Sequence, residues 1–133
     1  MRYLLDTHTF IWKMADSGRV PKSVYAATED PANEVFISAV SLWEIAIKRR
    51  MRKLDLGGLE NDDLIELAGK MGIATMALSP EEAVTYGNLT EDSHFDPFDR
   101  MLIWQAISRK MVLVSGDEQF QRFKPDGLKL LWK

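Results

Sequence analysis

The sequence has 133 residues, which fits one domain with a substantial core and is too short for two. Its 46% hydrophobic and 28% charged residues match an ordinary globular protein, and the absence of cysteine excludes disulfides and thiolate metal sites. The net charge of −3 argues against a nucleic-acid binder driven by overall charge alone, and no apolar stretch approaches the roughly 18 residues of a membrane span. Because the N-terminal stretch does not resemble a signal peptide either, we expect a cytoplasmic protein with no membrane partner.

Short apolar strands alternate with helices along the chain. Strands are expected at 2–5 (RYLL), 34–38 (EVFIS), 73–78 (IATMAL) and 111–115 (MVLVS), with a short edge strand at 127–132. Helices are expected at 7–14, after Pro21, and at 40–52, 64–71, 80–87 and 97–110. Continuously apolar strands separated by helices are typical of a parallel sheet covered on both faces. The sequence therefore predicts one α/β domain over residues 1–133: a three-layer α/β/α sandwich with a mainly parallel central sheet of four to five strands.

Four acidic residues lie close to predicted strands. Asp6 directly follows the first strand, and Glu44 lies in the helix after the second strand. Asp99 lies at the start of the helix that precedes the fourth strand, and Asp117 follows the fourth strand. Ligands of open parallel sheets bind at the carboxyl ends of the strands, so the fold is able to gather these acids. Clustered carboxylates repel one another unless a cation neutralises them, and their oxygens suit Mg²⁺ or Mn²⁺. Such ions activate water and stabilise in-line displacement at phosphorus.

Each acid taken alone also has a purely structural explanation. Ser41 and Glu44 have the spacing of a capping box, which Ser79 and Glu82 repeat with no chemistry implied. Asp117 is able to cap the short helix that follows it, and Asp6 is able to end its strand in an Asx-turn. Four acids near strand ends are much harder to explain by capping than any one of them.

The stretch HFDPFDRMLIWQA (94–106) contains two aspartates with different predicted roles. Asp96 precedes Pro97, so Asp96 is expected at the N-cap, Pro97 at the first helical position and Asp99 at the third. Asp99 shares a helix face with Leu102 and Ala106, where an unpaired carboxylate is costly. We therefore assign Asp96 to the cap and Asp99 to the metal.

Four segments resemble the PIN-domain ribonucleases, most closely the VapC-like toxins of bacterial toxin–antitoxin pairs. The segments are LLDTH (4–8), SAVSLWEIAIK (38–48), DPFDRMLI (96–103) and LVSGDEQF (113–120), and they stand in the family's order and spacing. The resemblance implies a PIN-like fold in which Asp6, Glu44, Asp99 and Asp117 hold Mg²⁺ or Mn²⁺, with Ser115 at the family's supporting hydroxyl position.

The resemblance also implies an activity and partners. Family members cleave single-stranded regions of RNA through metal-activated water, leaving a 5′-phosphate and a 3′-hydroxyl. They usually form homodimers and are silenced by an antitoxin protein whose tail covers the site. Two positions depart from the family: Trp104 replaces a small residue found in many relatives, and Gly116 makes the loop before Asp117 more flexible than a bulkier residue would.

The basic and aromatic residues carry weaker signals. In the run KRRMRK (48–53), Lys48, Arg49 and Arg52 either contact phosphate or an antitoxin, or stabilise a helix C-terminus on a solvated face. Arg100 is predicted either to contact the substrate or an antitoxin, or to form a surface salt bridge. His8 is expected at the surface and His94 in a loop. The tryptophans at 12, 43 and 104 are expected in the core or at a dimer contact rather than as a base-stacking platform.

Three other functions are weighed against the same residues. A dehalogenase-type phosphatase needs a second aspartate where His8 stands, and a phosphate-accepting receiver domain needs an acidic pair and a late lysine that the chain lacks. A catalytically silent acidic module that binds a basic partner would normally have lost one of the four acids. The sequence therefore favours a metal-dependent endoribonuclease, with a phosphatase of another α/β family or the silent module as the alternative.

Overall fold

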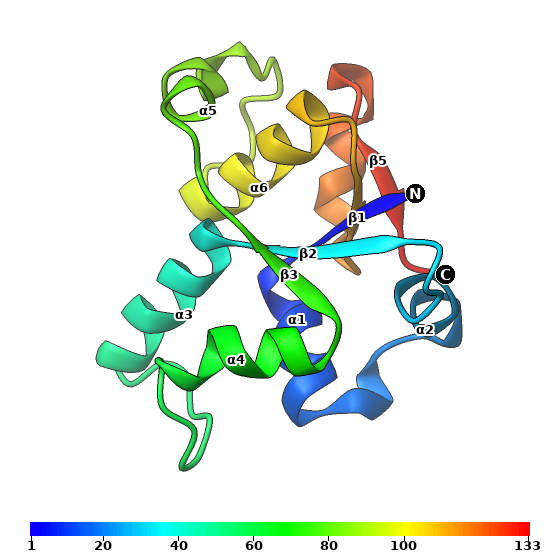
Figure 1. Cartoon of the computed structure of the whole chain (residues 1–133). Coiled ribbons are helices and arrows are strands. Elements are labelled where there is room, and N and C mark those ends of the chain that lie inside the picture. The colour runs from blue at the N-terminus through cyan, green and yellow to red at the C-terminus, as the bar shows by residue number, and fades with distance from the viewer.

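The sheet is wholly parallel. The computed structural model describes all 133 residues and contains five strands in the order β3-β2-β1-β4-β5 (Figure 1). The strands are β1 (Arg2–Leu5), β2 (Glu34–Ser38), β3 (Ile73–Met76), β4 (Val112–Val114) and β5 (Lys129–Leu131). The predicted parallel sheet of four to five strands is thus confirmed.

Six α-helices and three 3₁₀ helices connect the strands. The α-helices are α1 (Thr7–Ala15), α2 (Lys22–Thr28), α3 (Ala39–Arg50), α4 (Asp63–Lys70), α5 (Pro80–Thr85) and α6 (Pro97–Ser108). The 3₁₀ helices span Ser17–Arg19, Tyr86–Asn88 and Glu118–Asp126. Every predicted helix is present, with ends shifted by one or two residues, and none has the length and apolarity to span a bilayer.

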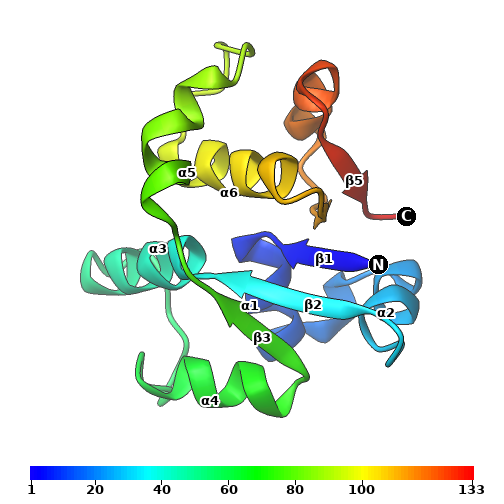
Figure 2. The ribbon, with the colours of Figure 1, turned by 45° about the horizontal axis from the view of Figure 1, so that its top comes forward.

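The helices cover both faces of the sheet, because successive strand residues point to opposite sides. Leu4 of β1 belongs to the core beneath α6 and the 118–126 helix, where it joins Leu102 and Phe120. Leu5 belongs to the opposite core, formed with α1 to α4. Figure 2 shows α5 and α6 on one side of the sheet and α1, α2 and α4 on the other. The predicted three-layer sandwich is therefore confirmed.

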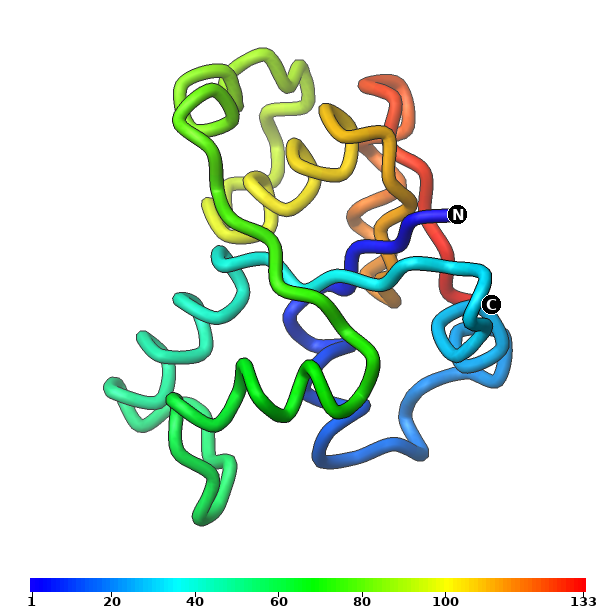
Figure 3. The backbone as a smooth tube through the Cα atoms, viewed as in Figure 1, coloured from blue at the N-terminus to red at the C-terminus, as the bar shows by residue number.

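The strand order creates an opening at the middle of the sheet. From β1 the chain moves outward through β2 and β3 on one side, then returns to β4 and β5 on the other. The direction of winding thus reverses between β1 and β4, and ligands of open parallel sheets bind at the carboxyl ends of strands at such a reversal. The Asp6 N–H donates to the Val114 carbonyl at 3.0 Å, which fixes the start of the β1 loop against β4. Figure 3 follows the backbone to a C-terminus on the same side of the molecule as the N-terminus.

Helix α3 begins three residues earlier than the capping-box prediction requires. Its N-cap is Ser38, whose hydroxyl accepts from the Val40 N–H at 3.0 Å. Ser41 therefore lies inside the helix and Glu44 lies in its middle, so the capping box predicted for this pair is wrong. The box predicted for Ser79 and Glu82 is present at the start of α5. A side-chain role for Glu44 beyond capping is thus required.

Glu82 also ties α5 to α6. Its carboxylate accepts from Arg109 at 2.6 Å and 2.8 Å and from the Gln105 amide at 3.1 Å. Gln105 in turn accepts from the Ser38 hydroxyl at 2.6 Å, which links this network to the end of β2. Burial alone would raise the pKa of Glu82, but Arg109, the Ser79 N–H and Gln105 outweigh it and lower the pKa to about 2.

We expect Glu82→Gln to destabilise the fold in a pH-dependent way. The folded pKa of about 2 lies below the ordinary value of 4.5, so the charge stabilises the fold above pH 4.5 and loses this effect as pH falls toward 2. At pH 7 the variant should lose about 1–3 kcal/mol of unfolding free energy. Urea titrations at several pH values should show the gap to wild type closing in acid. Glu81→Gln, on the exposed face of α5, is the control, and an equal loss there or a gap independent of pH would contradict this role.

Candidate functional site

Asp6 connects the end of β1 to the start of α1. Its side chain caps that helix by accepting from the Thr9 N–H at 2.7 Å, rather than forming the Asx-turn considered for it. The residue is only 4% exposed, and burial raises the pKa of its carboxyl above the usual range, although the hydrogen bonds of Ser115 and Thr9 act in the opposite direction. Capping thus engages Asp6 but does not offset the cost of burying its charge.

Glu44 is held from two sides in the middle of α3. The Thr7 hydroxyl lies 2.6 Å from Glu44 Oε1 and 2.9 Å from Ser41 Oγ, and its single proton goes to the carboxylate. The Lys48 ammonium, one turn along the helix, binds the other carboxylate oxygen. Glu44 is 2% exposed, so these partners satisfy a charge that water does not reach. Thr7 is a site residue that the sequence did not single out.

Asp96 and Asp99 lie at the N-cap and at the third helical position of α6, as predicted from the proline between them. Asp96 is the N-cap of α6 and accepts from the Asp99 N–H at 3.0 Å. Asp99 instead faces His94, whose Nε2 lies 3.0 Å from its carboxylate. Burial is the main cause that raises the pKa of Asp99 to about 6. The negative charges of Asp96 and Glu44 raise it further, whereas the hydrogen bond with His94 lowers it. Asp99 is therefore the carboxyl of this pair that a nearby cation would stabilise most.

His94 is more than the loop residue that the sequence predicted. Its ring is 9% exposed and meets Phe120 and Phe123 edge-on, with centroid distances of 5.7 Å and 6.1 Å. Nδ1 faces the Gln119 side-chain oxygen at 3.0 Å while Nε2 faces Asp99. Both ring nitrogens of His94 therefore have a hydrogen-bond partner. The sequence feature that could have indicated this role is that His94 stands only two residues before Asp96, the N-cap of α6.

Asp117 follows β4 and lies beside Asp6. Its N–H donates to the Ser115 hydroxyl at 3.1 Å, and its carboxylate caps the 118–126 helix by accepting from the Gln119 N–H at 2.9 Å. Asp117 is exposed, in contrast to Asp6. The two acids line one shallow hollow with His8, Trp12 and Gly116. The structure therefore brings the first and last of the four predicted acids to the same opening between β1 and β4.

The four acids are grouped as two neighbouring pairs rather than one closed set of ligands. No three His, Asp or Glu side chains come close enough together to hold one ion. The second pair, Glu44 and Asp99, shares its surroundings with Lys48: burial would lower the pKa of this lysine, but Glu44, Asp96 and Asp99 raise it. Lys48 thus pairs with Glu44 as a side-chain cation, and His94 is a hydrogen-bond partner of Asp99.

A hard divalent cation fits the chemistry of these donors. The predicted ligands are four carboxylates, with hydroxyls on Thr7 and Ser115 beside them and no sulfur donor. A cluster of carboxylates without a metal ion is expected to have raised pKa values and to attract other cations. The raised pKa of Asp99 and the Lys48 ammonium on Glu44 fit this expectation. Binding an ion by three acids requires side-chain movement, with Lys48 leaving Glu44 or His94 leaving Asp99.

The other predicted basic contacts lie in different surroundings. Arg100 donates to the carbonyls of Glu91 and His94, at 2.6 Å and 3.1 Å, and so secures the loop that positions His94. Arg49 donates to the Asn61 side chain at 3.0 Å on the surface. Arg52 is exposed beyond the end of α3, with a φ of 57°. Of the predicted basic contacts, Lys48 is the one that binds a predicted metal ligand.

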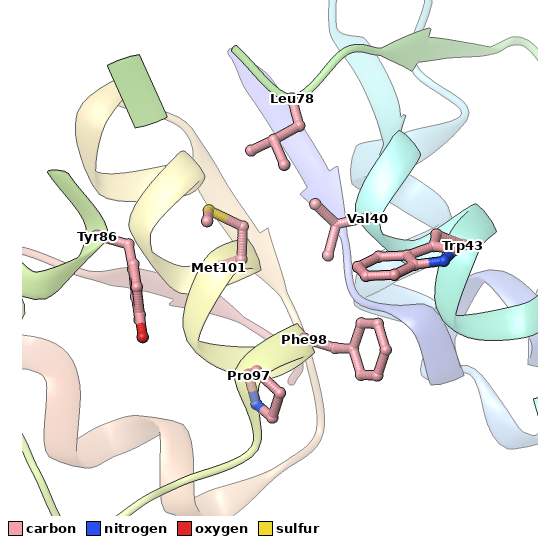
Figure 4. A pocket seen from close by; sticks show the side chains of 7 residues that line it. All are labelled: Val40, Trp43, Leu78, Tyr86, Pro97, Phe98 and Met101. Atoms are coloured by element: carbon pink, nitrogen blue, oxygen red, sulfur yellow. The ribbon is translucent and has the colours of Figure 1, made fainter. Parts of the chain in front are cut away.

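An apolar groove adjoins Glu44 and Asp99. Figure 4 shows its lining: Val40, Trp43, Leu78, Tyr86, Pro97, Phe98 and Met101. Trp43 precedes Glu44 and is 62% exposed, and its ring meets that of Phe98 edge-on at 5.4 Å. Trp104 is instead half-buried against the core and donates to the Thr85 hydroxyl at 3.0 Å. Trp104 thus packs against the core, while Trp43 is exposed, so that of the two places expected for it the dimer contact stays a prediction.

Comparisons with known proteins agree with this fold. The family model described as PIN domain matches residues 3–124. A chain of VapBC2 from Rickettsia felis, solved with a DNA fragment from its promoter, is 20% identical with a TM-score of 0.75, covering 100% of both chains. A chain of VapBC-1 from nontypeable Haemophilus influenzae is 20% identical with a TM-score of 0.68, over 98% of this chain and 97% of that one.

A third solved structure shares the fold, FitAcB from Neisseria gonorrhoeae. It is 18% identical with a TM-score of 0.60, and the match covers 97% of this chain and 96% of that one. No curated protein sequence matches the chain. At these identities the solved structures show a common fold.

We expect divalent ions to stabilise the protein through Asp99. Excess Mn²⁺ should raise the melting temperature by about 5 °C or more at roughly 100 times its Kd. Asp99→Asn should abolish most of this shift, yet be at least as stable as wild type without ions, because the buried charge is gone. Asp92→Asn, on the exposed loop before His94, should keep the full shift in a thermal melt. A shift that survives Asp99→Asn would place the ion elsewhere.

Proposed function

The chain belongs to the PIN-domain family, and on this premise we propose that it is a divalent-metal-dependent endoribonuclease, the toxin of a toxin–antitoxin pair. The observation that carries the proposal is the grouping of four acids, most of them buried or partly buried, at the reversal of strand order. Asp6 and Asp117 share one hollow there, and burial, with Asp96 and Glu44, raises the pKa of Asp99 beside it. A cluster of charges so costly to bury is expected at a functional site.

Asp6, Glu44, Asp99 and Asp117 would hold Mg²⁺ or Mn²⁺. When bound, such an ion neutralises the phosphate and makes water a better nucleophile. The oxygen of water would attack phosphorus and lose a proton, and the bond from phosphorus to the 3′ oxygen would break as that oxygen takes a proton from solvent, which would leave a 5′-phosphate and a 3′-hydroxyl. Thr7 orients the Glu44 carboxylate and Ser115 holds the loop of Asp117, so both act as positioning residues. No serine or cysteine nucleophile is needed.

The proposed partner is an antitoxin protein. The similar solved structures are of VapBC and Fit proteins, and a toxin that cleaves cellular RNA would harm the cell unless a partner silenced it. We propose that a basic or aromatic segment of the antitoxin reaches the acids and takes the role that Lys48 and His94 have here. Co-purification of the chain with the product of a neighbouring gene would support this, and free accumulation of the active enzyme in cells would count against it.

The apolar groove is the proposed homodimer contact. Trp43, Leu78 and Tyr86 are exposed at 62%, 37% and 41%, and they lie together around a groove lined mainly by apolar atoms. A contiguous exposed apolar surface of this kind marks a protein interface. Light scattering should give the mass of two chains for wild type and of one for Trp43→Glu, and a monomeric wild type would exclude the dimer.

Two alternatives make different predictions for the same residues. A phosphatase of another α/β family would release phosphate from small phosphoesters and leave RNA intact. A silent acidic module would bind its basic partner and show no divalent-dependent cleavage. Retention of all four acids, three of them buried or partly buried at the same edge of the sheet, favours the nuclease.

The pair Asp96 and Asp99 gives the sharpest test of the proposed activity. Asparagine caps a helix about as well as aspartate but is an uncharged and poorer metal ligand. Asp96→Asn should therefore keep most cleavage of a single-stranded RNA in Mn²⁺. Asp99→Asn should stay folded and lose cleavage by roughly 100-fold or more.

The assay needs two controls. Chelation of divalent ions should abolish cleavage by wild type and by Asp96→Asn alike, and circular dichroism should show both variants folded. Equal activity of the two variants, or loss in Asp96→Asn alone, would reverse the roles assigned to them.

A further inference from the structure

Three aromatic side chains form a row beside the hollow of Asp6 and Asp117. The ring of His8 lies 5.9 Å from that of Trp12, and the ring of Trp12 lies 5.9 Å from that of Trp132, with interplanar angles of 39° and 56°. His8 and Trp12 belong to α1, while Trp132 follows β5 at the far end of the chain. Trp12 and Trp132 pack partly on the core and keep an accessible part, and His8 is exposed.

The row borders two hollows that meet at Asp117. Trp12 and His8 line the hollow that contains Asp6 and Asp117. Trp132 lines a second, mainly polar hollow of about 390 Å³, which shares Gly116 and Asp117 with the first. A strand of nucleic acid whose phosphate reaches Asp117 therefore has aromatic rings within reach on both sides.

Gly116 fixes the position of Trp132. A Cβ atom on residue 116 would lie 2.7 Å from Trp132 Cε2, which is closer than two carbon atoms that are not bonded approach each other. The indole thus lies directly against the backbone of the loop that carries Asp117. The flexibility expected of Gly116 is not its main property, because close packing of this ring is what requires glycine. The Ser23 hydroxyl also donates to the Trp132 carbonyl at 2.8 Å, which anchors the segment from α2.

Positive charges accompany the row in a chain whose net charge is −3. The Arg19 guanidinium lies 4.3 Å from the centre of the Trp12 ring and is 58% exposed, so its outer plane is accessible. Lys124 and Lys133 line the second hollow. Aromatic or guanidinium planes that stack on bases, together with cations that contact phosphates, are the features that bind single-stranded nucleic acid.

We propose that His8, Trp12 and Trp132 form a stacking surface for unpaired bases of RNA next to the cleaved bond, with Arg19, Lys124 and Lys133 contacting its phosphates. The choice of RNA rests on the proposed function. The surface explains how a net-negative enzyme with four acids at its centre holds a polyanion: stacking supplies attraction that does not depend on charge. Trp12 then has the base-stacking role that its position in the sequence did not favour.

The test measures binding and cleavage separately. Anisotropy of a fluorescein-labelled single-stranded RNA in EDTA reports binding without cleavage, and the same RNA in Mn²⁺ reports cleavage. Trp132→Leu, Trp12→Leu and His8→Ala should each weaken binding, by roughly 5- to 100-fold for the tryptophans. His8→Ala removes an exposed ring and is the variant least able to disturb the fold. Trp104→Leu, which removes a tryptophan beneath α5, is the matched control and should bind RNA as wild type does.

Abasic nucleotides identify stacking directly. Wild type should bind more weakly when the base at one position beside the cleaved bond is removed, and this loss should vanish in the variant that lacks the ring facing that base. Variants that are folded and bind every RNA as wild type does would overturn the stacking surface, as would variants that lose only a protein partner. Base-dependent binding without any cleavage would support the surface and overturn the nuclease, and a wild type that binds no RNA would overturn both.

Discussion

The cost of holding carboxylates together, away from water, is the constraint on which the rest of this structure depends. Asp6 and Glu44 are almost wholly buried and Asp99 is largely so. In the protein alone, the Lys48 ammonium on Glu44 and the hydrogen bond between His94 and Asp99 offset part of this cost. A cluster of acids whose burial is this costly is a candidate functional site.

The parallel sheet makes this cluster possible. Its winding reverses at β1, so the loops after β1 and β4 open at the same edge and bring Asp6 and Asp117 together. Helices α3 and α6 contribute Glu44 and Asp99 from the adjoining side. Under the proposed function, a metal ion or a basic partner segment would compete with Lys48 for the oxygens of Glu44. Activation by an ion and inhibition by a protein tail would then be two outcomes of that competition.

Local rules explain what could be predicted from the sequence. Strand and helix positions follow from apolar patterning, and the place of Asp96 at the N-cap of α6 follows from the proline after it. The position of Glu44 within its helix does not follow from such rules. Serine at 38 and serine at 41 both suit an N-cap, and only the packed structure selects Ser38. The contacts of His94 and the close approach of Trp132 to Gly116 join segments far apart in the fold, and no local pattern encodes them.

The most direct measurement is anomalous scattering from crystals soaked in Mn²⁺. We predict a manganese peak bounded by the carboxylates of Asp6, Glu44, Asp99 and Asp117, with the Lys48 ammonium displaced from Glu44. A peak at another place, or none while Lys48 still binds Glu44 at saturating Mn²⁺, would contradict the claim that these acids form a metal site.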